Sequence, residues 1–185
     1  MGKSGKKSRD RRREDAAVWA AGRMGLEHVD LQPVCGDASF RRYFRFNANG
    51  RSVILMDAPR YRENSERFLD AGARLKSAGL RTPDIYHFDL DLGFGILEDF
   101  GDVLFCDIFS KDTVDTLFPR LFEVLEVQAR RADSFGLPEY NEERLQMELD
   151  LFPDWYLAQH KHRPLSASDR TAWQDMCGLL TESAR

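Results

Sequence analysis

The sequence is poor in cysteine and contains no long apolar run. Its three cysteines, Cys35, Cys106 and Cys177, are widely spaced and form no Cys-x-x-Cys pair, so we expect reduced thiols and no disulfide framework. The four histidines do not fall into ligand spacing with them, which argues against a zinc site. No stretch reaches the roughly 18 apolar residues of a membrane helix, and no apolar segment follows the start as a secretory signal requires. These absences predict a cytoplasmic protein without membrane contact.

Charge is nearly balanced over the chain but uneven along it. The 27 Lys and Arg residues against 31 Asp and Glu give a formal net charge of -4, which argues against a nucleic-acid binder as a whole. Residues 3–13 are strongly basic, and Asp10 is the only acid among them. Such a run either binds nucleic acid or anionic lipid, or remains in water. We expect a disordered basic tail over residues 1–13.

The hydrophobic pattern predicts three strands, a helix, two more strands and then helices only. The expected strands are 31–34, 40–46, 52–56, 85–88 and 94–97, and the expected helices among them are 14–25 and 62–78. In the second strand Arg42 alternates with phenylalanines on one face, while Arg41 and Arg45 lie on the other. This order predicts an α+β fold with a five-stranded antiparallel sheet plus helix. It is the layout of a protein kinase-like N-terminal lobe.

The expected domains are the tail, this N-terminal lobe over residues 14–101, and an incomplete helical C-terminal lobe over residues 102–185. In the last part Pro153 is expected to kink or end a helix over 143–152. Ser166 begins the pattern of a capping box. The last helix carries an apolar stripe that predicts self-association. The stripe consists of Trp173, Met176, Cys177 and Leu180.

A loop of small residues joins the first two predicted strands. It consists of Gly36, Asp37, Ala38 and Ser39. A loop that covers nucleotide phosphates needs inward-pointing backbone N–H groups and little bulk, and these residues meet that requirement. A plain structural turn uses the same residues, so both readings are open.

The third predicted strand lacks the lysine that kinase-like folds use. In such folds a strand lysine holds the nucleotide phosphates and pairs with a helix glutamate, but the lysine position here is Met56. Other residues nearby carry suitable charges, although each reads equally well as a surface residue in water. The candidate acids are Glu63 and Glu66, and the candidate cations are Arg41, Arg42 and Arg45.

The segment after the fifth predicted strand is the expected hinge, whose main chain contacts adenine. Glu98, Asp99 and Phe100 are therefore predicted nucleotide contacts. Asp99-Phe100-Gly101 and His87-Phe88-Asp89 also match the metal-binding and catalytic triplets of protein kinases. The asparagine required five residues after Asp89 is Phe94, however, and both triplets belong to the predicted first lobe. We therefore assign no catalytic or metal-binding residue.

Two sequence runs resemble the aminoglycoside phosphotransferase family, and within it the anomeric amino-sugar kinases of bacterial cell-wall recycling. They are GDASFRRYFR at 36–45 and LMDAP at 55–59. The segments 97–102 and 148–156 resemble the hinge of these kinases and a helix of their second lobe, so that the match spans about residues 26–180.

The resemblance implies a cytoplasmic kinase that uses ATP and magnesium to phosphorylate an amino sugar, such as N-acetylmuramate or N-acetylglucosamine, in peptidoglycan recycling. It also implies that the catalytic loop and the metal-binding Asp come later in such proteins, so we expect this chain to be truncated and inactive alone. Two other readings are open. One is a non-catalytic nucleotide-binding or interaction module, and the other is a kinase for another small-molecule hydroxyl, of the aminoglycoside or choline type.

Overall fold

The computed structural model describes residues 10–34 and 39–183, and the chain divides into two compact units, Met1–Asp133 and Ser134–Arg185. The first unit contains a five-stranded antiparallel sheet with helices, so the predicted α+β fold is confirmed. Its elements are α1 (Arg11–Met24), β1 (Gln32–Val34), β2 (Arg42–Ala48), β3 (Arg51–Asp57), α2 (Ser65–Ser77), β4 (Ile85–Asp89), β5 (Phe94–Glu98), α3 (Phe105–Ile108) and α4 (Val114–Arg131).

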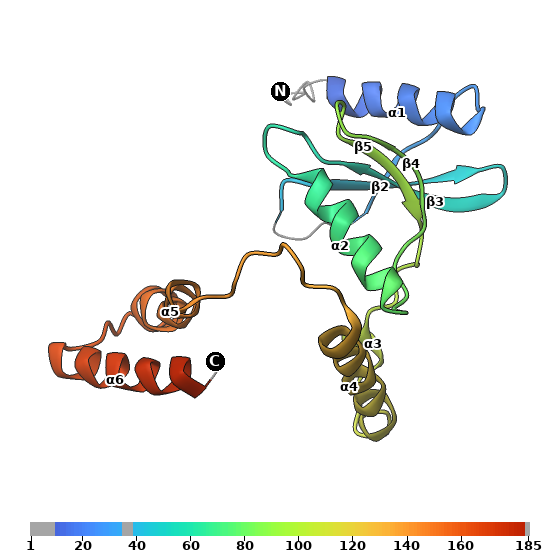
Figure 1. Ribbon diagram of the computed structural model, residues 1–185. Helices are drawn as coiled ribbons and strands as arrows, with labels where there is room; N and C mark the ends of the chain where they lie inside the picture. The colour runs from blue at the N-terminus through green and yellow to red at the C-terminus, as the bar shows by residue number, and fades with distance from the viewer. Residues whose placement is uncertain (1–9, 35–38, 184–185) are drawn as a thin grey trace. The chain divides into compact units, whose positions relative to one another are not determined.

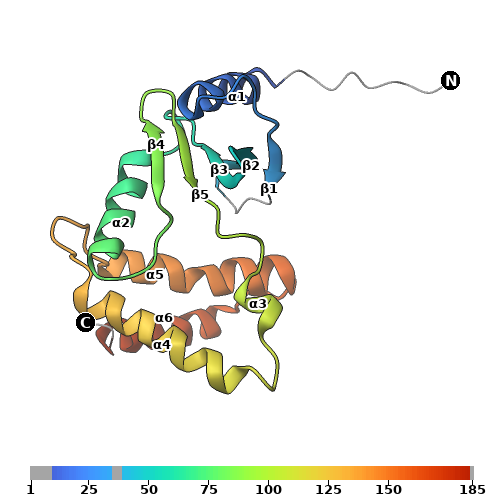
Figure 2. The ribbon, with the colours of Figure 1, turned by 90° about the vertical axis from the view of Figure 1, so that its right-hand side faces the viewer.

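The sheet has the strand order β1-β2-β3-β5-β4, and α1 and α2 lie on its opposite faces (Figures 1 and 2). Successive side chains of a strand point to opposite faces, so each face has its own apolar cluster. The cluster under α1 includes Ala16, Ala20, Phe44, Phe46, Val53, Leu55 and Ile96. The cluster on the α2 face consists of Met56, Ala58 and Leu97, packed against Tyr43, Ile54, Phe68 and Phe88.

Helix α1 begins at Arg11, three residues before the predicted start. The side chain of Asp10 caps the helix, because its Oδ1 accepts a hydrogen bond from the Arg13 N–H at 3.1 Å. Residues 11–13 therefore belong to the helix, which corrects the predicted tail over 1–13. Residues 1–9 of that tail lie outside the described part of the chain.

The turn between β4 and β5 is fastened to the end of β3 through Gly93. Its N–H donates to the Asp89 carbonyl at 2.8 Å, and its own carbonyl accepts from the Ala58 N–H at 2.8 Å. Gly93 has a φ of +70°, and a Cβ atom there would lie 2.1 Å from the Ala58 oxygen. Glycine is therefore required at this position both by conformation and by space.

The second unit contains α5 (Glu142–Leu151), a π-helix η1 (Phe152–His160) and α6 (Ala167–Ser183). The predicted break at Pro153 is confirmed, because α5 ends at Leu151. Proline has no N–H to continue the α-helical ladder, and the chain widens into π-helical turns that end with a bond from Lys161 N–H to the Tyr156 carbonyl at 2.9 Å. The predicted cap of α6 is also present, since the Ser166 Oγ accepts from the Asp169 N–H at 3.2 Å.

The apolar stripe of α6 is partly covered within its own unit. Cys177 is buried, and Trp173 stacks on Phe152 at 5.4 Å while its Nε1 donates to Asp150 at 3.2 Å. The other two residues of the stripe, Met176 and Leu180, are exposed. Self-association through α6 stays a prediction.

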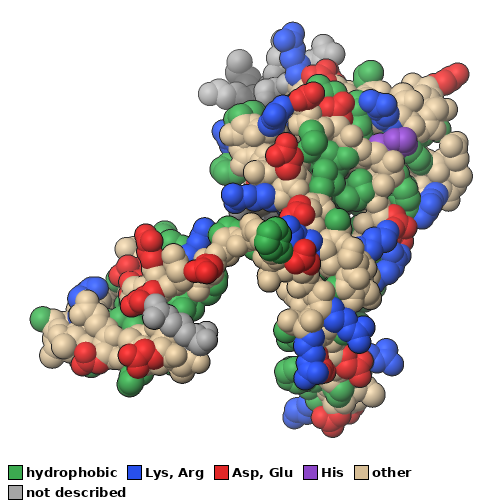
Figure 3. All heavy atoms as spheres, in the orientation of Figure 1, with side chains coloured by type: hydrophobic (Ala, Val, Ile, Leu, Met, Phe, Trp, Pro, Cys, Tyr) green, Lys and Arg blue, Asp and Glu red, His purple; other side chains and the backbone are tan. Residues whose placement is uncertain are grey.

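Helix α4 has no buried side chain, and Phe118, Phe122 and Leu125 are exposed on it. Figure 3 shows hydrophobic side chains beside charged ones along this helix. Within residues 10–34 and 39–183, no helix combines the length and the apolar character needed to cross a membrane.

Candidate functional site

The loop between β1 and β2 is described only at its end. The predicted contacts Gly36, Asp37 and Ala38 lie outside the described residues. The Ser39 Oγ accepts a hydrogen bond from the Arg41 N–H at 3.2 Å, which folds the end of the loop locally. The next residue, Phe40, donates its N–H to Glu63 Oε1 at 3.0 Å, so the loop end is attached to the segment before α2.

Glu63 is not part of the helix in which the sequence placed it. Helix α2 begins at Ser65, because the Asn64 side chain caps it by accepting from the Arg67 N–H at 3.0 Å. Besides the Phe40 N–H, the Glu63 carboxylate accepts from Arg41 Nε at 3.0 Å, and its side chain is only 12% exposed. Glu63 thus forms an ion pair with a cation that comes from the loop.

Met56, at the expected lysine position, faces α2 and is fully buried. It lies opposite Gly95 of β5, and a Cβ atom at Gly95 would lie 2.6 Å from the Phe88 ring. With Phe68 and Leu97 this ring surrounds the Met56 side chain. An ammonium group would be desolvated here, so the position is unsuited to lysine.

Arg42 lies on the opposite face of the sheet from Met56. Its Nη2 contacts Asp57 at 2.6 Å, and Arg12 of α1 contacts the same carboxylate at 2.6 Å. Arg42 also forms an ion pair with Asp10, the cap of α1. The structure therefore does not bring Arg42 together with Met56.

Glu98, in the predicted hinge, is held by groups from the segment before β4. Its carboxylate pairs with Arg81 and accepts from the Asp84 N–H at 3.1 Å, while its own N–H donates to the Asp84 carbonyl at 2.8 Å. The Arg81 hydrogen bond lowers the pKa of Glu98 below its usual value. Phe100 follows, exposed and with the Arg81 guanidinium 5.0 Å from its ring centre.

Asp99 is tied to β2 by Arg45. Arg45 Nε donates to Asp99 Oδ2 at 2.6 Å and Nη2 to Oδ1 at 2.9 Å, while the hydroxyl of Ser52 donates to the same carboxylate. Arg45 also binds Asp102 through two nitrogens, at 2.7 and 2.9 Å. The hydrogen bonds from Arg45 hold the pKa of Asp99 well below its usual range.

Asp99→Asn is expected to make the stability of the sheet unit depend less on pH in the acid range. The folded-state pKa of Asp99 is depressed, so its contribution is complete above the unfolded value of about 3.9 and is lost as the pH falls through the folded value. Thermal melting between pH 6 and pH 2.5 measures this, and the difference in melting temperature from the unsubstituted chain should narrow below about pH 4. Asp91→Asn is the control, since Asp91 pairs with Arg60 in water. Parallel curves for Asp99→Asn and the unsubstituted chain would contradict the assignment.

The two kinase-like triplets lie in the sheet unit, as predicted. His87 and Asp89 belong to β4, and the Asp89 Oδ1 accepts from the Leu92 N–H at 2.9 Å in the turn that follows. Asp99 follows β5 directly. Both carboxylates have structural partners within the unit.

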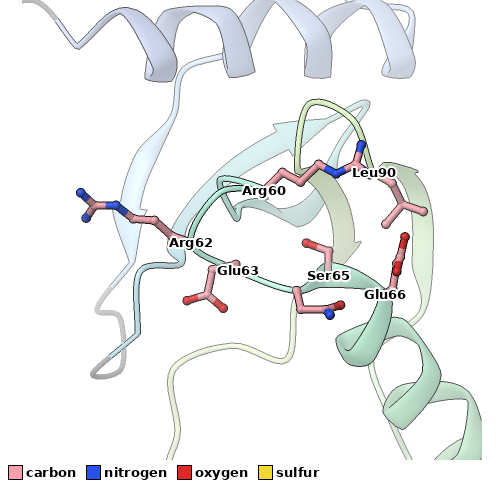
Figure 4. A pocket seen from close by; sticks show the side chains of 7 residues that line it. Arg60, Arg62, Glu63, Ser65, Glu66 and Leu90 are labelled. Carbon is pink, nitrogen blue, oxygen red and sulfur yellow. The ribbon is translucent and has the colours of Figure 1, made fainter.

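A surface hollow lies beside the start of α2 (Figure 4). Two arginines and two glutamates line it, so its charges balance. The Ser65 Oγ, also in the lining, is buried and has no hydrogen-bond partner within the described part of the chain. In Figure 4 the Arg62 side chain points away from the hollow. Its lining consists of Arg60, Arg62, Glu63, Asn64, Ser65, Glu66 and Leu90.

Sequence reasoning separated Arg42 from Arg41 and Arg45 by strand face but did not assign an acidic partner to any of the three. It weighed them as equivalent sources of charge, whereas the structure gives each a different acidic partner: Glu63 for Arg41, Asp57 and Asp10 for Arg42, and Asp99 and Asp102 for Arg45. The structure confirms the separation by face, because Arg42 pairs with Asp57 on the α1 face of the sheet.

A five-stranded antiparallel sheet in this order, with one helix between β3 and β4, is the layout of the N-terminal lobe of kinase-like folds. No protein-family model matches the chain. Three curated proteins named N-acetylmuramate/N-acetylglucosamine kinase are similar to it.

The relative from Pseudomonas aeruginosa is 39% identical over 157 residues, which covers 84% of this chain and 46% of that protein. The Pseudomonas putida relative is 36% identical over 154 residues, with 83% and 45% covered. The relative from Neisseria meningitidis serogroup B is 33% identical over 157 residues, with 82% and 46% covered. The chain therefore spans about half the length of the curated relatives that it matches.

Proposed function

We propose that this chain is the nucleotide-binding part of an ATP-dependent kinase that phosphorylates the anomeric hydroxyl of an amino sugar. The observation that carries the proposal is the similarity to three amino-sugar kinases over 82–84% of the chain. The kinase-like order of the strands supports it. We place this kinase in the cytoplasm, in peptidoglycan recycling, because its proposed phosphate donor is ATP. The free thiols of Cys106 and Cys177 agree with a reducing compartment.

The proposed ATP site is the α2 face of the sheet, between the end of the β1–β2 loop and the segment after β5. Adenine recognition in kinase-like folds uses main-chain groups of the hinge, and the N–H of Phe100 has no acceptor among the described residues. The phosphates would lie toward Ser39 and the loop before it, where small residues let backbone N–H groups approach.

Magnesium accompanies ATP in this reaction, and it neutralises charge on the phosphates. The two carboxylates that match the kinase triplets do not fit a magnesium site, because Asp99 is ion-paired with Arg45 and Asp89 accepts a hydrogen bond in a turn. We therefore assign no step to the metal within this chain.

ATP is expected to bind weakly, with a dissociation constant of about 0.1–1 mM, or about -5.5 to -4 kcal/mol. The affinity is expected to be low because Asp99 and Asp89 are held in structural contacts and are not available to a phosphate-bound magnesium ion. Isothermal calorimetry or an NMR titration with ATP measures it. Nanomolar affinity, or no binding at several millimolar ATP, would contradict the proposal.

The same sample with ATP, magnesium and N-acetylglucosamine or N-acetylmuramate tests transfer. We expect no sugar phosphate above a blank, since Asp89 and Asp99 are held in structural contacts. Turnover that Asp89→Asn abolishes would instead make Asp89 catalytic.

A further inference from the structure

Among the described residues, Arg41 has more unused side-chain donors than the two arginines of β2, Arg42 and Arg45. Arg42 forms ion pairs with two carboxylates, those of Asp10 and Asp57. Arg45 donates four hydrogen bonds, two to Asp99 and two to Asp102. Arg41 makes one side-chain hydrogen bond, from Nε to Glu63. Among the described residues its two terminal nitrogens donate to no other group.

The position of Arg41 is fixed from two sides. Glu63 accepts from the Arg41 side chain and also from the Phe40 N–H, so one carboxylate holds both the guanidinium and the end of the loop. The guanidinium lies over the ring of Phe68 in α2, 5.1 Å from its centre. Phe68 packs in turn on Met56, the buried residue at the expected lysine position. Arg41 is thus a cation on the same face, next to the position that cannot hold a lysine.

This arrangement has the two charges of the usual kinase ion pair, supplied by other elements. In that pair a strand lysine contacts the α- and β-phosphates, and a helix glutamate orients it. Here the cation precedes β2 and the acid precedes α2. A guanidinium anchored through Nε still presents its two terminal nitrogens, whose fork matches two oxygens of a phosphate group.

We propose that Arg41 contacts the phosphates of bound ATP and that Glu63 positions it, so that this pair replaces the missing lysine and its partner. The inference rests on the proposed function, because it names a residue of the same ATP site. A purely structural role, in which the pair only fastens the loop, is the alternative that the experiment must exclude.

The test compares ATP, ADP and adenosine in NMR titrations, which measure millimolar dissociation constants. In Arg41→Met the affinity for ATP and ADP should fall about tenfold, the usual size for losing one charge-assisted contact, while adenosine binding stays unchanged. Glu63→Gln keeps an acceptor for the Phe40 N–H, so its affinity for ATP should fall by a smaller factor than that of Arg41→Met. Arg130→Met is the matched control, since it removes the same charge from α4 at an exposed i,i+4 pair, and its ATP affinity should not change.

The outcomes separate the two proposals. If the unsubstituted chain binds neither ATP nor adenosine, the proposed function fails. If it binds ATP, and a folded Arg41→Met protein retains the same preference for ATP over adenosine, the role of Arg41 is overturned. If Arg41→Met does not fold, Arg41→Gln decides, because glutamine can still donate to Glu63. Arg41→Gln should also lower the affinity for ATP about tenfold. Unchanged ATP affinity in this variant would equally overturn the proposed role of Arg41.

Discussion

Gly93→Ala is expected to destabilise the sheet unit by about 2–6 kcal/mol, the sum of two costs. A non-glycine residue at a φ of +70° costs about 1–3 kcal/mol, and forcing a Cβ into packed atoms costs about 1–3 kcal/mol more. The Ala58 carbonyl cannot move away easily, because the Ala58 N–H is bonded to the Gly93 carbonyl at 2.8 Å. The substitution therefore strains both the β4–β5 turn and the end of β3.

Urea unfolding followed by Trp19 fluorescence measures this loss. Trp19 packs on Phe94 in the sheet unit, and replacing Trp155 and Trp173 with phenylalanine removes the signal of the second unit. Gly50→Ala is the matched control, since Gly50 has a φ of +86° but no atom within 4 Å of a Cβ. Gly50→Ala should lower the free energy of unfolding only by the conformational cost, about 1–3 kcal/mol. Equal losses at the two glycines would refute the steric argument.

The double substitution Arg12→Met and Arg42→Met is expected to cost about 3–5 kcal/mol, because it leaves a fully buried carboxylate without a partner. Asp57 has no exposed surface, and these two guanidinium groups contact it at 2.6 Å. Each arginine alone should cost less, since the other remains. The loss of stability in the double variant should therefore exceed the sum of the losses in the two single variants.

Adding Asp57→Asn to the double variant provides the decisive comparison. It removes the buried charge, so the triple variant should regain part of the lost stability in the same unfolding experiment. Asp57→Asn alone should be milder than the double substitution, because the arginine side chains are 34% and 39% exposed and water can solvate them. A triple variant less stable than the double would show that packing of the arginine side chains, and not the unpaired charge, causes the loss.

The periodicity of the sequence was sufficient to predict the sheet and its neighbouring helices. Alternating aromatic residues in β2, β-branched residues in β3 and turn residues between the strands are local signals, and the structure places the ends of the five strands and of α1 and α2 within three residues of prediction. The errors occur where a capping side chain decides the boundary. Asp10 starts α1 early and Asn64 starts α2 late, which moved Glu63 out of the helix.

The candidate site was harder to predict because its partners are distant in sequence. Arg45 and Asp99 are 54 residues apart, and Arg41 and Glu63 are 22 apart. No periodicity within one segment records such pairs, so the sequence indicated which charges were present but not which would neutralise one another. The residue at the lysine position was identified from the strand alone, yet the closed apolar surroundings of Met56 depend on Phe68 and Phe88 from two other elements.

The contacts of Arg12 show that the first turn of α1 is part of the folded sheet unit. Beyond its ion pair with Asp57, Arg12 donates to the Leu92 carbonyl at 2.7 Å, and its guanidinium lies 4.6 Å from the centre of the Phe94 ring. One side chain in the first turn of α1 thus bridges the end of β3 and the β4–β5 hairpin. Deletion of residues 1–13 would remove Arg12 and with it all three contacts. Deletion of residues 1–9 would leave these contacts in place.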